Sequence, residues 1–159
     1  MLQKVIVLFC FSLLAILVQL LFVPWMTIRN IRPDFILLLV LIVGRLKGRI
    51  VGQLYGFSIG LLVDAIGMGS FLGLSALTKT ISGFFSGYLK NQKGRLNLFS
   101  YYAIAIIIIF AHFVIFYLVN FKGAEFTTYH IILRYVIPAS IYTSVFYILI
   151  DHFLPLGSE

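Results

Sequence analysis

The chain has 159 residues, of which 62% are hydrophobic and 11% are charged. Soluble domains are about 45–50% apolar and about 25% charged, so this composition predicts an integral membrane protein. The formal net charge of +7 does not indicate a nucleic-acid-binding protein. The basic residues form short clusters beside apolar runs, as at the ends of membrane helices, and no basic stripe lies on a soluble module.

Six apolar segments predict an all-α bundle of six transmembrane helices, because a spanning helix needs about 20 mainly apolar residues. The connections between them are short, so we expect one integral membrane domain, 1–159, without a soluble domain. The first segment has no small-x-small cleavage site at its end, which favours a retained helix over a signal peptide. The predicted helices are residues 5–23, 33–46, 50–66, 71–89, 99–121 and 131–153.

The second and third segments are predicted to form a tight hairpin through Gly48. A single helix through both would be roughly 50 Å long and would place charges in the middle of the membrane. We expect Arg45 and Lys47 to snorkel to the interface. At the start of the second segment, Pro33 suits the first helical position, and Asp34 complements the dipole of the first turn.

The distribution of basic residues predicts the orientation of the chain, because cytoplasmic loops carry an excess of Lys and Arg. The amino-terminal end and loops 2–3 and 4–5 hold seven such residues, and the opposite loops hold four. We therefore expect both termini in the cytoplasm. The seven are Lys4, Arg45, Lys47, Arg49, Lys90, Lys93 and Arg95, and the four are Arg29, Arg32, Lys122 and Arg134.

Glycines recur every four residues in the third segment, which places them on one helix face. In lipid, such a face allows a close helix crossing. It can pack within the chain or can form a docking face for another protein. The fourth segment carries a similar face of small residues. The candidate packing or partner-binding glycines are Gly52, Gly56, Gly60, Gly73, Gly83 and Gly87.

Asp64 continues the series of the glycines, and a carboxylate in a membrane helix is a candidate functional group. Three roles are open. Asp64 can cap the turn at 67–70 and the start of the fourth segment, it can pair with Lys79, or it can serve a ligand or partner. The pair is geometrically possible because the Lys79 side chain points back toward the start of its helix.

No catalytic set is visible in the sequence, which contains no HExxH, GxSxG or P-loop motif. We therefore do not expect an enzyme. The single cysteine, Cys10, and three scattered histidines offer no metal-ligand spacing, so no metal or cofactor is expected. His112 is interpreted as a hydrogen-bonding residue inside the bundle rather than as a ligand. The acids are Asp34, Asp64, Glu125, Asp151 and Glu159.

Three motifs within residues 31–90 together resemble the MreD family of bacterial rod-shape-determining membrane proteins. Residues 97–159 fit that family only in hydropathy. The motifs are Pro33-Asp34-Phe35, then Gly52-x-x-x-Gly56-Phe57-x-x-Gly60-Leu61-x-x-Asp64, and then Phe71-Leu72-Gly73-Leu74-x-Ala76-Leu77.

The resemblance implies a non-catalytic scaffold of the cell-elongation complex, which directs lateral peptidoglycan synthesis from the bacterial inner membrane. It implies binding to MreC, a single-span protein, in an assembly with MreB, RodA and a penicillin-binding transpeptidase. It also implies a fold similar to the six-helix substrate-binding S components of energy-coupling-factor (ECF) vitamin transporters. No chemistry is assigned to the family-motif positions. These are Pro33, Asp34, Gly52, Gly56, Gly60, Asp64 and Gly73.

An alternative function is a solute-binding membrane subunit of a vitamin-type transporter. Such a subunit should have an outward-facing polar pocket with aromatic and charged walls. The sequence offers few residues for this pocket, and Gln53, Asp64 and Lys79 are the candidates.

Overall fold

The computed structural model describes residues 2–29, 31–67, 71–123 and 125–153, with side chains from residue 12 onward. The described chain is helical and contains no named strand. Its helices are α1 (Leu2–Leu21), α2 (Phe35–Lys47), α3 (Arg49–Ala65), α4 (Leu74–Ser86), the 3₁₀ turn η1 (Gly87–Leu89), α5 (Leu98–Asn120), α6 (Thr128–Ile131), the π-helical turn η2 (Ile132–Val136) and α7 (Ile137–Phe153).

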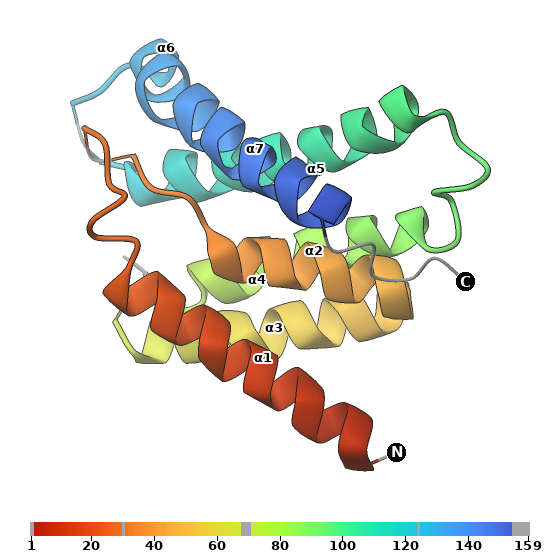
Figure 1. The fold of residues 1–159 in the computed structure, drawn as a ribbon. Helices are drawn as coiled ribbons and strands as arrows, with labels where there is room; N and C mark the ends of the chain where they lie inside the picture. The colour runs from red at the N-terminus through yellow and green to blue at the C-terminus, as the bar shows by residue number, and fades with distance from the viewer. Residues whose placement is uncertain (1, 30, 68–70, 124, 154–159) are drawn as a thin grey trace.

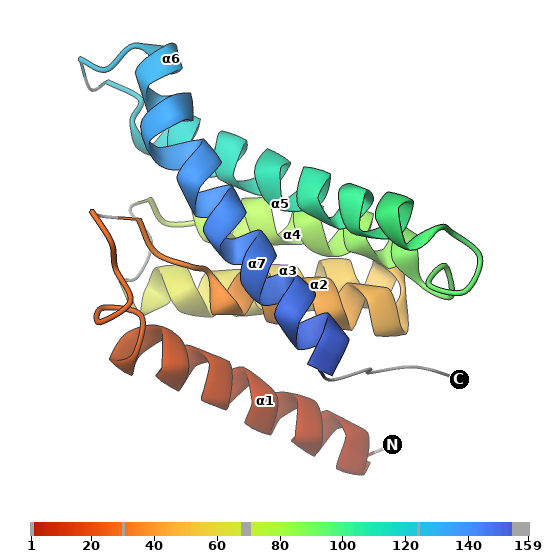
Figure 2. The ribbon, with the colours of Figure 1, turned by 45° about the horizontal axis from the view of Figure 1, so that its top comes forward.

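Helix α2 is the central element of the bundle. It packs against α1, α3 and α4 and also against α7. Helices α1 and α7 lie on opposite sides of the layer formed by α2, α3 and α4, and α7 crosses this layer obliquely next to α5 (Figures 1 and 2). The start of α1 and the end of α7 lie toward the end of the bundle that carries the α2–α3 turn, in both views.

The connection between α2 and α3 is the single residue Gly48. Its φ of +98° is a conformation that glycine adopts without the steric cost of a side chain. Its N–H donates to the carbonyl of Gly44 at 2.7 Å, which closes the last turn of α2. The two helices therefore form an antiparallel pair with no loop between them.

Helix α4 begins at Leu74, three residues later than the range 71–89 predicts. The cause is Gly73, which has a φ of +93° and so lies outside the helix. The predicted turn at 67–70 is only partly visible, because residues 68–70 lie outside the described part of the chain.

The segment predicted as one helix over 131–153 is continuous but irregular in its first turns. It begins at Thr128, and the π-helical turn η2 precedes Pro138 by two residues. Proline has no N–H to donate to the carbonyl four residues earlier, so the hydrogen-bond ladder must adjust at this place.

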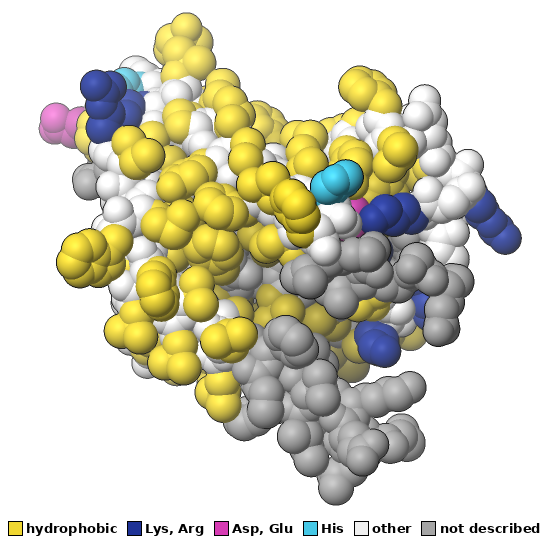
Figure 3. Space-filling model, viewed as in Figure 1, with side chains coloured by type: hydrophobic (Ala, Val, Ile, Leu, Met, Phe, Trp, Pro, Cys, Tyr) yellow, Lys and Arg dark blue, Asp and Glu magenta, His cyan; other side chains and the backbone are white. Residues whose placement is uncertain are grey.

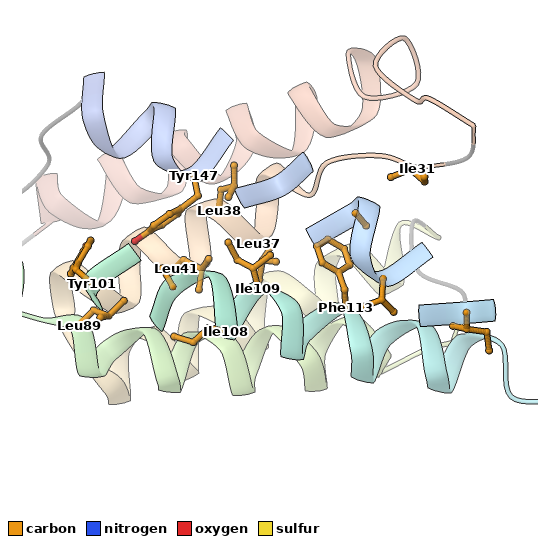
Figure 4. Close-up of a cluster of buried hydrophobic side chains, with 14 residues drawn as sticks. Ile31, Leu37, Leu38, Leu41, Leu89, Tyr101, Ile108, Ile109, Phe113 and Tyr147 are labelled. Carbon is orange, nitrogen blue, oxygen red and sulfur yellow. The ribbon is translucent and has the colours of Figure 1, made fainter. Parts of the chain in front are cut away.

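The main apolar core lies between α2, α5 and α7 (Figure 4). Tyr101, Ala105 and Ile109 project from one face of α5 and are fully buried. They meet Leu37, Leu38 and Leu41 of α2 and Tyr147 of α7. A second cluster, which joins α1 to α2 and α3, is formed by Ile16, Ile36, Val40, Ile59 and Val63.

Among the residues whose side chains the structure describes, two helices are long and apolar enough to cross a membrane by themselves, Leu98–Asn120 and Thr128–Phe153. Much of the outer surface is also apolar: Leu54 of α3 is 62% exposed and Ile107 of α5 is 64% exposed. Figure 3 shows hydrophobic side chains across the middle of one face, with Lys and Arg toward its two opposite ends. This pattern is typical of a surface in contact with lipid.

Candidate functional site

The glycines of α3 form a close backbone contact with α4, which we call the glycine seam. A Cβ atom at Gly56 would lie 2.7 Å from the carbonyl carbon of Lys79, and one at Gly60 would lie 2.5 Å from the Cα of Ala76. These distances leave no room for a side chain. Because α4 already occupies the space next to these glycines, a helix of another protein could not contact them. The glycines that pack in this way against helices of their own chain are Gly44, Gly52, Gly56, Gly60, Gly83 and Gly87.

Gly73 has a different role from the one expected of a packing residue. A Cβ atom there would meet nothing within 4 Å. Glycine is needed at this position because the backbone has a positive φ there, which turns the chain into α4. The space around Gly73 is therefore not part of the seam.

Asp64, near the end of α3, binds the start of α4. Its carboxylate accepts hydrogen bonds from the backbone N–H groups of Gly73 at 2.9 Å, Ser75 at 3.3 Å and Ala76 at 3.2 Å. The first N–H groups of a helix have no partner within the helix, and a carboxylate also complements the positive end of the helix dipole. Of the three roles open for Asp64, this is the capping role.

Lys79 pairs with Asp34 rather than with Asp64. Its Nζ lies 2.7 Å from Asp34 Oδ2, and its side chain is 3% exposed. The Lys79 side chain does point back toward the start of α4, as the sequence predicts, but there it meets α2. The expected Asp64–Lys79 pair is wrong because the glycine seam brings the backbone of Lys79, not its side chain, against α3.

Asp34 is the N-cap of α2 and joins this helix to α4, α5 and α7. It accepts from the N–H of Leu37 at 2.7 Å, and its own N–H donates to Thr143 Oγ1 at 3.3 Å. His112 Nε2 lies 3.7 Å from Asp34 Oδ2. Pro33 precedes this cap and so lies outside the helix, not at its first position as expected. We call Asp34, Lys79 and His112 the Asp34 cluster.

The cluster is held by neighbours that the sequence analysis did not single out. Gln19 of α1 donates to the carbonyl of Pro33 at 3.3 Å and accepts from the N–H of Phe35 at 3.0 Å. Ser82 Oγ lies 3.3 Å from His112 Nδ1. His112 is thus hydrogen bonded inside the bundle, in agreement with its interpretation as a buried polar residue.

A cavity of about 740 Å³ opens beside the Asp34 cluster. It lies where α1, α3 and α5 end and where α2, α4 and the last helix begin. Its polar lining includes Gln19, Arg32, Asp34, Lys79, His112 and Asn120, and its aromatic lining includes Phe116, Tyr117 and Tyr135. Of the three pocket candidates from the sequence, Lys79 lines this cavity, but Gln53 and Asp64 do not.

A second polar cluster lies at the opposite end of α2, and we call it the Asp151 cluster. Arg45 Nη1 forms an ion pair with Asp151 and donates to Tyr101 OH at 3.0 Å. Lys93 Nζ lies 2.8 Å from Asp151 Oδ2, to which Tyr102 OH also donates at 3.0 Å. Arg45 is 5% exposed, so the expectation that it snorkels to the interface is wrong. It turns inward because Asp151 supplies its countercharge.

Sequence reasoning missed Asp151 as the partner of Arg45, since 106 positions separate the two residues. One signal was present. Asp151 lies in a predicted spanning segment, and an acid in such a segment needs a partner or a polar cavity. Asp34 was identified by its helix-start pattern, but its ion pair with Lys79 was not.

A family model described as rod shape-determining protein MreD matches residues 1–155. The comparison with curated proteins gives no significant match, and neither does the comparison with solved structures. The family match covers nearly the whole chain, including the carboxy-terminal half, where the sequence motifs gave no indication. On this evidence, the chain belongs to the rod shape-determining MreD family of bacterial membrane proteins.

Proposed function

We propose that this chain is a non-catalytic scaffold of the bacterial cell-elongation complex and that it binds an MreC-like single-span protein. The observation that carries the proposal is the family match over residues 1–155. In this role the protein places wall-synthesis enzymes, among them RodA and a penicillin-binding transpeptidase, near MreB along the lateral inner membrane.

The placement in the membrane that fits this role has all six helical segments crossing the bilayer and both termini in the cytoplasm. Helices α2, α3 and α4 have 13, 17 and 13 residues, so they need their flanking residues to complete a span. The basic residues around Gly48 and over 90–95 lie toward the same end as the start of α1. This supports a cytoplasmic location for that end.

The partner-binding surface in this proposal is part of the apolar exterior. The glycine seam is closed by α4, so the partner helix must contact exposed side chains instead. In lipid, contact between helices depends on packing rather than on the hydrophobic effect, because lipid tails are as apolar as the side chains.

A solute-binding subunit of a vitamin-type transporter remains the second candidate, because the cavity beside Asp34 has charged and aromatic walls. Such a subunit would share a six-helix architecture like that of the ECF S components. The family match favours the scaffold, because the family is defined by rod-shape determination.

The test is affinity purification of the tagged full-length chain from native membranes in mild detergent, followed by mass spectrometry. A tagged, unrelated six-span protein of similar abundance is the control. We expect an MreC-like protein and wall-synthesis enzymes to be enriched only with this chain. Enrichment of an ATPase pair and a coupling subunit would contradict the scaffold and support the transporter.

A further inference from the structure

We propose that the cavity beside Asp34 is a binding site for a small ligand that carries an anionic group, either a carboxylate or a phosphate, next to a hydrogen-bond donor. Its volume of about 740 Å³ lies within the roughly 300–1,000 Å³ of pockets that hold small molecules. The proposal goes beyond the scaffold function, which needs no such ligand.

The charges in the cavity wall favour an anion. Among the described residues, its charged lining consists of two cations, Arg32 and Lys79, and one anion, Asp34. The ion pair between Lys79 and Asp34 balances one of these cations, so Arg32 leaves an excess of positive charge. A cleft with walls of low dielectric constant concentrates such a potential and raises the local concentration of anions.

Lys79 has donors left for a ligand. An ammonium group has three N–H donors, and Asp34 accepts one of them at 2.7 Å. Within the described chain, no other hydrogen bond is found for Lys79 Nζ. The buried ammonium is held in place by Asp34, so an incoming anion would meet a fixed donor and would cost little ordering of the protein.

The hydrogen-bond donor of the ligand is inferred from Asn120. Its side-chain oxygen is inaccessible to solvent and has no hydrogen-bond partner among the described residues, and Asn120 lines the same cavity. A buried acceptor without a partner is unfavourable, and rotation of the side-chain amide would bring this oxygen to a ligand N–H or O–H in the cavity. Phe116 and Tyr117 add aromatic surface for the body of the ligand.

The source of the anion can be a soluble metabolite or the headgroup of an anionic lipid, and the experiment has one arm for each. The first arm measures thermal unfolding of the purified full-length chain in an uncharged detergent at constant ionic strength. Its probes are inorganic phosphate, glycerol 3-phosphate and N-acetylglycine. The second arm counts bound lipids by native mass spectrometry after reconstitution with phosphatidylglycerol or with phosphatidylcholine.

The matched variants are Arg32→Gln, which removes a cation from the cavity wall, and Arg29→Gln, which removes one from the same loop outside the wall. Both side chains are exposed, so neither variant should affect folding. With a soluble probe at about ten times its Kd, we expect the unfolding midpoint to rise by about 3–6 °C in the native chain and in Arg29→Gln, but not in Arg32→Gln.

A lipid source would instead give phosphatidylglycerol-specific binding that Arg32→Gln loses and Arg29→Gln keeps. If no probe in either arm has an effect that depends on Arg32, the proposal is overturned. An equal loss in both variants would also overturn it, because that result reports surface charge. The assay uses the isolated chain, so a negative result leaves the co-purification test of the scaffold unaffected.

Discussion

The two polar clusters at the opposite ends of α2 each pair a carboxylate with a buried cation but differ in their surroundings. In the Asp151 cluster, the carboxylate is 1% exposed and receives Arg45, Lys93 and Tyr102. In the Asp34 cluster, the carboxylate side chain is 17% exposed and lines a cavity.

The difference indicates different roles. Both oxygens of the Asp151 carboxylate have partners among the described residues and the side chain is buried, so the cluster joins α2, α5 and α7. The Asp34 cluster is also held by hydrogen bonds to the surrounding helices, but one side of it faces the cavity. A buried ion pair gains little stability over apolar packing. The position of the Asp34–Lys79 pair in the wall of a cavity favours a role in binding.

The largest expected effect is the loss of Asp151. In Asp151→Asn, the Arg45 guanidinium remains buried without its countercharge, and we expect the free energy of unfolding in mixed micelles to fall by about 3–5 kcal/mol. Lys93→Ala should cost less than about 1 kcal/mol, because the Lys93 side chain is 38% exposed and can reach water. Equal losses in the two variants would contradict the prediction, because they would mean that the buried Arg45 depends on Asp151 no more than the exposed Lys93 does.

The glycine seam provides a second test, because it sets the position of the Lys79 backbone and thus of the Asp34 cluster. In Gly56→Ala, the new methyl group would overlap the backbone of Lys79, and we expect a loss of about 1–3 kcal/mol in the free energy of unfolding. The matched control is Gly94→Ala, where a Cβ meets nothing within 4 Å. A Gly56→Ala protein as stable as this control would mean that α3 and α4 are not in close contact.

The smallest effect is the coupling between Lys79 and its partner. A double-mutant cycle with Lys79→Met and Asp34→Asn should give a coupling energy of about 0.5–3 kcal/mol, because the two side chains are in contact. The cycle of Lys79→Met with Asp64→Asn should be additive within about 0.5 kcal/mol. Measured unfolding free energies that show the opposite order would restore the Asp64–Lys79 pair.

Local features of this chain were accessible from the sequence because neighbouring residues cause them. Gly48 between two apolar segments predicts a hairpin, and the structure places α2 and α3 on either side of this one residue. Asp34 before an apolar run predicts the start of a helix. Gly73 was assigned to packing because glycine is the expected residue both at a close helix contact and at a positive φ. The sequence does not distinguish these two reasons for a glycine.

The choice of partner for each buried charge was not accessible in the same way. The sequence offered Asp64 for Lys79 because both were expected near the same end of adjacent helices. Which of two nearby acids a lysine meets depends on the rotation of its helix, and the backbone contact at Gly56 sets that rotation. Arg45 was expected at the membrane interface for a similar reason, since nothing local indicates Asp151.

The sequence by itself determined that the chain is helical and membrane-embedded and that its α3 carries a face of glycines, because composition and periodicity are sums over local residues. Only the tertiary structure decided that this face packs on α4, that Asp34 rather than Asp64 holds Lys79, and that a polar cavity opens beside them. These features depend on how whole helices are rotated and spaced, and many contacts distant in sequence fix that arrangement together.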